Sequence, residues 1–186
     1  YQWMNAFDVE VQDFVLSLLA EVVQQYELDG IHGDDRLPAL PSEAGYDSTT
    51  LSRFQQATGR VDSPAQYDEE WIKWRAERLN EFMGRIHKEI KALAPDCQIS
   101  VSPSIYPWSK EQYLQDWPTW VKEGWVDMVC PQVYRYDIEK YRNELRKIAT
   151  EQVQAADLSI VFPGILLKVG DYVASDTLLQ QMEEEN

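Results

Sequence analysis

The sequence predicts an α/β fold of the (β/α)8 TIM-barrel class, in the form of a partial barrel with about four to five parallel strands and flanking helices. Short apolar runs alternate four times with amphipathic helical segments, which is the pattern of parallel strands covered by helices. The stretches that follow the apolar runs are long or rich in aromatic and charged residues. In such barrels the loops after the strands build the active site.

The first half of the chain contains the clearest helical patterns. Apolar residues recur at spacings of three and four from Val11 to Val23, behind Asp8 as the expected N-cap. "DGIHGD" predicts a short strand. A short helix is expected over residues 49–57, closed by Gly59. "SPAQ", starting at Ser63, reads as a capping box that opens a helix reaching about residue 93.

Three further strand–helix units are expected in the second half. "QISVSPS" predicts a strand followed by a helix over about 111–122, in which Pro118 is expected to begin or break a turn. "WVDMVCPQVY" predicts the next strand, with a helix over 138–154 behind it. "LSIVFPGILL" predicts a fourth strand before a last helix over 175–185. The segment from Tyr1 to Met4 is interpreted as the remnant of a fifth strand.

The length predicts one domain, residues 1–186, of catalytic (β/α)-barrel type and incomplete at both ends. A whole barrel takes about 250 residues. Residues 36–63 are interpreted as a long active-site loop insertion. If the barrel is truncated, its open sheet edges favour a dimer or a swapped assembly.

Composition narrows the classes of partner. The net charge of −15 argues against nucleic acid, because a phosphate-binding surface needs clustered basic side chains. No apolar run is long enough to span a membrane. Seven tryptophans and ten tyrosines suit a neutral polysaccharide or glycan, although any one ring can simply be core. Cys97 and Cys130 are expected to be two buried thiols rather than a bridge.

The segment "LDGIHGDDRLP" carries the candidate carboxylates. Side chains alternate along a strand, so if Ile31 faces the helices, His32 and Asp34 face the barrel axis. Asp35 and Arg36 then lie on the rim. A carboxylate at the last inward position sits where substrate would bind, and His32 is expected to hydrogen-bond Asp34. The alternative is a Gly-Asp-Asp turn without function.

Other chemistries have less support. Only two histidines are present, which excludes a histidine-rich zinc site. Asp34, Asp35 and His32 as ligands of Mg²⁺ or Ca²⁺ form an alternative, but no metal and no cofactor are expected. No GxSxG, Walker or GxGxxG pattern occurs. "SVSPS" is expected to lack a partner histidine nearby, so serine nucleophile chemistry is not expected.

Three stretches resemble the glycosyl-hydrolase-like 10 family, formerly domain of unknown function 187. They are "YQWMNAFDVEVQDFVLSLLAEVVQQYELDGIHGDDRLP", "QISVSPSIYPW" and "WVKEGWVDMVCPQVYRYD". The resemblance covers nearly the whole chain and keeps the order of the motifs. It implies a (β/α)8 barrel, a glycoside hydrolase of O-glycosyl bonds and an extracytoplasmic location: periplasmic, cell-envelope or secreted. Family members are bacterial, and some act on the glycan strands of peptidoglycan.

The resemblance also implies site residues. Asp34 is the first candidate for a catalytic carboxylate, and Asp35 belongs to the same pair. Substrate-binding candidates follow the strands and their loops: Asn5, His32, Arg36, Ser102, Tyr106, Trp108, Gln132, Tyr134 and Lys168. The chain departs from the family pattern at Gly33, Arg36 and Arg135, which points to a different substrate preference.

Glycoside hydrolysis ordinarily needs two carboxyl groups. Asp34 is one, and the second stays open among Asp35, Asp137, Asp171 and a residue outside this chain. Activity of the isolated chain stays open too. The rival hypothesis is a catalytically silent carbohydrate-binding barrel that stacks sugars on Tyr106, Trp108 and Tyr134. A third is a scaffold without sugar affinity.

Overall fold

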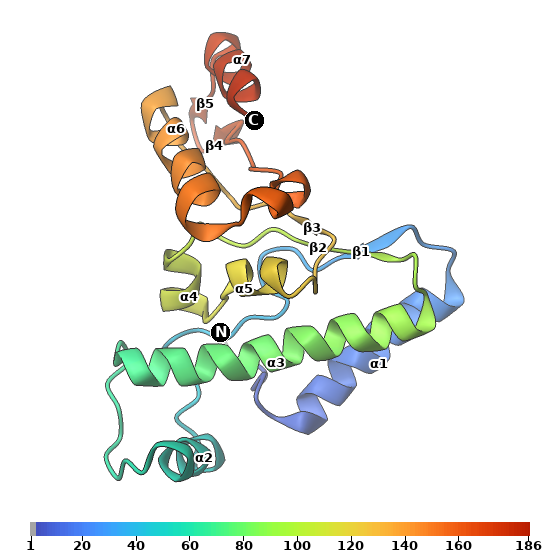
Figure 1. Ribbon diagram of the computed structural model, residues 1–186, viewed down its shortest axis with the longest axis vertical. Coiled ribbons are helices and arrows are strands. Elements are labelled where there is room, and N and C mark those ends of the chain that lie inside the picture. Colours follow the sequence, from blue (N-terminus) through green and yellow to red (C-terminus); the bar gives the residue numbers. More distant parts are fainter. Residues whose placement is uncertain (1–2) are drawn as a thin grey trace.

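The computed structural model describes residues 3–186, and these form a mixed α/β structure around a parallel sheet (Figure 1). The sheet has three strands in the order β1-β2-β3, all parallel. Ile31 pairs with Ile99, and Val101 pairs with Val129. The strands are β1 (Gly30–His32), β2 (Gln98–Val101) and β3 (Met128–Val129).

Two long helices, α1 (Val9–Gln25) and α3 (Glu69–Leu93), run side by side along the sheet (Figure 1). Asp8 caps α1 by accepting a hydrogen bond from the Glu10 amide, as the sequence predicts. The core between helices and sheet is apolar, and burial of this surface is the main stabilising term. Its fully buried members include Leu79, Met83, Ile86, Ile90, Ile99, Val101, Leu114, Trp117, Trp120 and Val129.

The two faces of the sheet differ in polarity. Along β2, Ile99 and Val101 are buried, whereas Ser100 and Ser102 are only half-buried. His32 on β1 is exposed on the same side as these serines, to which it is hydrogen-bonded. The polar face is therefore turned away from α1 and α3, as the alternation along the strands predicts.

Two glycines allow β1 and its turn to approach their neighbours closely. A Cβ atom at Gly30 would lie 2.8 Å from the Gln98 carbonyl oxygen, and one at Gly33 would lie 2.9 Å from the Leu37 carbonyl oxygen. Real Cβ atoms essentially never come so near to backbone atoms. The glycines of "DGIHG" are thus required by packing against β2 and the following turn.

The insertion after β1 folds against the start of α3. It contains α2 (Ser48–Thr58), which ends at Gly59 in the left-handed region, as predicted. Phe54 from α2 packs on Trp71 and Trp74 of α3 in a small second core. Whether this loop belongs to an active site stays a prediction.

The expected start of α3 at Ser63 is wrong. Asp68 is the N-cap, and its carboxylate accepts a hydrogen bond from the Trp71 amide. Glu69 and Glu70 then place two acidic side chains in the first turn, where they interact favourably with the helix dipole. The helix therefore begins at Glu69, several residues later than predicted.

The single helix expected over 111–122 is two helices, α4 (Trp108–Tyr113) and α5 (Trp117–Lys122). Leu114 between them adopts a left-handed backbone conformation. Pro118 lies in the first turn of α5, where a missing amide costs no hydrogen bond. The break between the helices lies at Leu114, and Pro118 begins a helical turn, which is one of the two predicted outcomes.

The expected fourth parallel strand is reduced to one bridge, between Val129 and Val161. The residues before the bridge coil into a 3-10 helix, η2, and the residues after it lead to an antiparallel hairpin. The described part of the chain thus has a parallel sheet of three strands instead of four to five. The remaining elements are α6 (Ile138–Lys147), η1 (Ile148–Gln152), η2 (Ala155–Ile160), β4 (Lys168–Val169), β5 (Tyr172–Val173) and α7 (Asp176–Glu185).

Some apolar surface of α1 has no partner within the described residues. Phe14, Leu18 and Val22 form a stripe at helical spacing and are 52%, 47% and 42% exposed. The segment Tyr1 to Met4, expected as a strand, lies partly outside residues 3–186, and its described part is not a strand. None of the described helices combines the length and apolar character needed to cross a bilayer.

Arg75 fastens the long loop to α3. Its side chain is fully buried, and its guanidinium donates to the carbonyl oxygens of Ser42 and Ala44, both at 2.7 Å, and of Gln66 at 3.2 Å. The guanidinium also lies over the Trp71 ring, 4.4 Å from its centroid. Burial lowers the pKa of Arg75 to about 10, so the group stays charged at neutral pH and its donors remain available.

We predict that Arg75→Met lowers the free energy of unfolding by about 3 kcal/mol, because it leaves buried carbonyl groups without donors. Urea unfolding of the variant measures this change. Lys88→Met, at an exposed position of the same helix, is the control and should change stability by less than about 0.5 kcal/mol. Equal effects of the two substitutions would contradict this role of Arg75.

Candidate functional site

The turn after β1 is held against the end of β2. The Leu37 amide donates to the Gly33 carbonyl oxygen at 3.1 Å, and the Ser102 amide donates to the Asp34 carbonyl oxygen at 2.8 Å. Asp34 has a φ of 51°, a left-handed conformation in which an L-residue is strained and Asp is one of the tolerated types. Its side chain is exposed and makes no hydrogen bond or ion pair within residues 3–186.

His32 forms hydrogen bonds with two serines of β2. Its Nδ1 lies 2.7 Å from Ser100 Oγ, and its Nε2 lies 3.1 Å from Ser102 Oγ. The expectation that His32 holds Asp34 is wrong, because both ring nitrogens already have serine partners. The expectation that "SVSPS" lacks a nearby histidine is also wrong, since the parallel pairing brings β1 beside β2.

Asp35 and Arg36 form a local pair. An Arg36 Nη1 atom lies 2.7 Å from the Asp35 carboxylate, and both side chains are about one-third exposed. The guanidinium also lies 3.9 Å from the centroid of the Tyr113 ring, a distance typical of a cation–π contact. The negative charge of the Asp35 carboxylate is therefore balanced by Arg36, whereas the Asp34 carboxylate has no basic partner within residues 3–186.

Three aromatic rings lie beside this pair. Tyr113 contacts Trp108 at 5.6 Å and Trp3 at 6.3 Å between ring centroids. Trp108 and Trp3 are 44% and 42% exposed, which is unusual for rings of this size. We call Trp3, Trp108 and Tyr113 the aromatic platform.

Gln115 holds the far side of the turn. It is 1% exposed, and its Nε2 donates to the carbonyl oxygens of Asp35 and Pro38 at 3.1 and 3.2 Å. The Leu40 amide donates to the Tyr113 carbonyl oxygen at 3.2 Å. The segment between α4 and α5 thus fixes both the turn and the platform residue Tyr113.

Gln132 and Tyr134 follow β3 on the same edge of the sheet. The side-chain amide of Gln132 donates to the Ser102 carbonyl oxygen at 2.8 Å, and a parallel bridge joins Gln132 to Ser104. Tyr134 is 44% exposed. The structure therefore places His32, Asp34, Ser102 and Gln132 along the carboxyl ends of three strands, and their roles toward a substrate stay predictions.

Three predicted binding residues lie elsewhere. Asn5 donates to the Asp47 carboxylate at 3.1 Å, beside the start of α2. Lys168 is exposed in the antiparallel β4–β5 hairpin, so it does not end a parallel strand as expected. Tyr106 packs edge-on against Trp117 in the helical layer.

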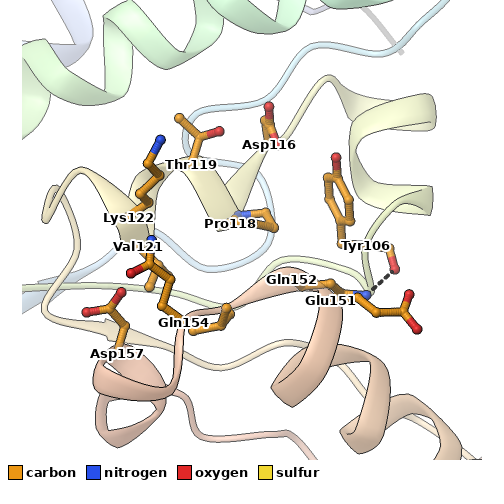
Figure 2. Close-up of a pocket in the computed structure, with 11 residues that line it drawn as sticks. Tyr106, Asp116, Pro118, Thr119, Val121, Lys122, Glu151, Gln152, Gln154 and Asp157 are labelled. Carbon is orange, nitrogen blue, oxygen red and sulfur yellow. Dashed lines mark hydrogen bonds between the residues drawn. The ribbon is translucent and has the colours of Figure 1, made fainter.

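Tyr106 lines a hollow of about 270 Å³ between α5 and the segment η1–η2 (Figure 2). Its carbonyl oxygen accepts a hydrogen bond of 3.1 Å from the Gln152 side chain. Burial, together with the negative charge of Asp116, raises the pKa of the Tyr106 phenol. The groups that line this hollow include the acidic side chains Asp116, Glu151 and Asp157 and the basic side chain Lys122 (Figure 2).

Asp137 and Asp171, two candidates for the second catalytic carboxylate, lie at a helix cap and in a hairpin turn. Asp137 is the N-cap of α6, and the hydrogen bond from the Lys140 amide, the main cause, lowers its pKa. Asp171 is exposed in the turn of the β4–β5 hairpin. Among residues 3–186, no three His, Cys, Asp or Glu side chains are grouped as ligands of a metal ion.

Sequence reasoning missed Ser100, Gln115, Tyr113 and Trp3. Ser100 could have been found, because it lies two residues before Ser102 on the same strand and so shares its face. The other three reach the site through the path of the loops, for which the sequence carries no comparable periodic signal.

A family model described as Glycosyl hydrolase-like 10 matches residues 1–168. The chain belongs to the glycosyl hydrolase-like 10 family. The family assignment agrees with the resemblance seen in the sequence, and the turn of Asp34 and Asp35 lies within the matched range.

Curated relatives of the chain are also named glycosyl hydrolases. Glycosyl hydrolase DigH of Escherichia coli K12 is 26% identical over 154 residues, which cover 69% of this chain and 33% of the relative. Glycosyl hydrolase YngK of Bacillus subtilis 168 is 25% identical over 142 residues, covering 67% of this chain and 26% of the relative. The chain spans about a third of the length of the E. coli relative.

The left-handed conformation of Asp34 predicts an unusual order of stabilities. Asp34→Gly should be more stable than Asp34→Ala by about 1 kcal/mol, because glycine adopts positive φ without strain. Asp29, at the other end of β1, is not among the positive-φ residues described, and there the glycine variant should be the less stable one. Chemical denaturation of the four variants measures both differences. The same order at both positions would contradict the strained turn.

Proposed function

We propose that the protein is a glycoside hydrolase of a cell-wall or other extracellular polysaccharide, with Asp34 as a catalytic carboxylate. The observation that supports this most is the exposed Asp34 carboxylate at the carboxyl end of β1, on the edge shared with Ser102 and Gln132. It lies in the same turn as Arg36, which contacts the aromatic platform through Tyr113. Membership of a glycosyl hydrolase-like family supports the same class of reaction.

Asp34 is the better candidate of the adjacent pair. The Asp35 carboxylate is tied to Arg36 and to the turn, so its protonation would disrupt an ion pair. The Asp34 side chain has no such partner within residues 3–186 and can approach a sugar. It can act as a general acid, a general base or a nucleophile. The second carboxyl group required by this chemistry is proposed to come from outside the described sheet, where the relatives are longer.

The aromatic platform supplies the binding surface in this proposal. Flat rings stack on the apolar faces of sugars without an opposite charge, which suits a protein with a net charge of −15 and a neutral glycan. Arg36 is stacked on Tyr113. In this proposal its guanidinium N–H groups donate hydrogen bonds to the hydroxyl groups of the bound sugar. A periplasmic, cell-envelope or secreted location is proposed on the family resemblance.

A carbohydrate-binding protein without catalysis is the second candidate, and the same platform favours it. It would bind glycan through Trp108 and Tyr113 and release no reducing ends. The two candidates therefore differ in turnover and not in affinity.

We predict that Asp34→Asn in the full-length protein lowers the release of reducing ends from glycan by at least about 100-fold. The melting temperature should stay nearly unchanged, because Asp34 makes no side-chain hydrogen bond in the described residues. Asp29→Asn, an exposed Asp at the amino end of the same strand, is the matched control and should retain full activity. Retained turnover by Asp34→Asn would remove Asp34 from the mechanism, and no turnover by the unmodified protein would favour the binding candidate.

We predict that Trp108→Ala weakens glycan binding about 10-fold, because one exposed stacking surface is lost. Calorimetric titration of a soluble oligosaccharide into the Asp34→Asn background measures affinity without turnover. Tyr26→Ala, which removes a ring that is 65% exposed at the end of α1, should leave affinity unchanged. Unchanged affinity in the Trp108 variant would show that the platform does not bind sugar.

A further inference from the structure

Ser102 and His32 form a hydroxyl–imidazole pair that glycoside hydrolysis does not use. Ser102 Oγ lies 3.1 Å from His32 Nε2, and the other ring nitrogen lies 2.7 Å from Ser100 Oγ. A nucleophile within hydrogen-bond reach of a base, with the base oriented by a third group, is the arrangement of acyl-transfer enzymes. We propose that this site hydrolyses acyl esters, with Ser102 as nucleophile and His32 as general base.

The hydrogen bonds on β1 and β2 are compatible with Nε2 as the basic nitrogen of His32. Ser100 Oγ donates its single hydrogen to the Ile31 carbonyl oxygen at 3.2 Å. In the proposed mechanism Ser100 Oγ accepts from His32 Nδ1, which carries the hydrogen of the neutral imidazole. The lone pair of Nε2 then faces Ser102 Oγ, which is the orientation that proton removal from Ser102 requires.

The same edge of the sheet keeps the pair accessible. His32 is exposed and Ser102 is half-buried, on the face turned away from α1 and α3. We assign the oxyanion of acyl transfer to neighbouring backbone amides. Those of Asp35 and Arg36 lie on the turn joined to Ser102 through the Asp34 carbonyl group, and within residues 3–186 they donate no hydrogen bond.

The reaction balances with water as the second reactant. Ser102 Oγ attacks the ester carbonyl carbon, its proton passes to His32 Nε2, and the bond to the leaving alkoxide breaks as that proton is returned to it. Water then attacks the acyl-serine and gives a proton to Nε2, and the Oγ–acyl bond breaks as Ser102 is protonated again. The products are an alcohol and a carboxylic acid.

The pair fits small acyl groups carried on sugar hydroxyls, such as O-acetyl groups of a polysaccharide. This choice of substrate rests on the proposed function, since Asp34 follows β1 on the edge that carries Ser102. The serine–histidine pair itself does not depend on it. A small chromogenic ester without a sugar therefore tests the pair separately from glycan cleavage.

We predict that a fluorophosphonate probe attaches covalently to Ser102 of the full-length protein, as located by tandem mass spectrometry. Hydrolysis of p-nitrophenyl acetate should fall at least about 100-fold in Ser102→Ala and in His32→Ala. Added imidazole should restore part of the activity of His32→Ala, which no structural role of His32 would produce. Ser100→Ala should lower turnover by a smaller factor, because His32 then loses its orienting acceptor.

Ser104→Ala is the matched control, since Ser104 follows in the same segment, and it should retain full esterase activity. Labelling needs no variant, so a folding defect in a substituted protein cannot obscure the result. A probe that leaves Ser102 unmodified, or undiminished turnover in Ser102→Ala, would overturn the assignment. Reducing-end release from glycan, measured in parallel, reports on the proposed glycosidase and stays unaffected if only the esterase assignment fails.

Discussion

The close parallel pairing of β1 with β2 is the constraint on which the site depends. Gly30 permits the approach because it has no Cβ atom to collide with the Gln98 carbonyl group. The ladder then continues past the strands, with the Gly33 amide bonded to the Ser100 carbonyl oxygen and the Ser102 amide bonded to that of Asp34, both at 2.8 Å. The register of this pairing thus fixes the position of the turn that carries Asp34 relative to the end of β2.

This register gives neighbouring groups different chemical characters. Asp35 is paired with Arg36, which in turn stacks on Tyr113, so the pair is structural and holds the rim. Asp34, one residue earlier, is left with an exposed carboxylate. His32 is directed to serines and not to Asp34, so proton transfer at Ser102 and at Asp34 can be independent. Two reactions on one glycan, cleavage of the chain and removal of acyl groups, would then share a single edge of the sheet.

The sequence was most informative where one local pattern decides the structure. Helix α1 with Asp8 as its cap and the placement of His32 on the face opposite to that of Ile31 follow from spacing alone. Prediction was wrong where two local signals compete, as Ser63 and Asp68 do for the start of α3. It was also wrong at the expected fourth strand, where pairing is limited to one bridge at Val161. The positions of Gln115 and Tyr113 depend on how the segment between α4 and α5 meets the loop after β1. Such contacts join residues far apart in the sequence, and the spacing of apolar residues along the chain does not predict them.

The central claim is that the Asp34 carboxylate meets the glycosidic bond on this edge. A crystal structure of full-length Asp34→Asn with a bound oligosaccharide tests it most directly, because the amide marks the position of the carboxylate without turnover. The account predicts a glycosidic oxygen or anomeric carbon within about 3.5 Å of the substituted side chain, with a sugar ring stacked on Trp108. An oligosaccharide bound away from the turn after β1, with that side chain left in solvent, would contradict it.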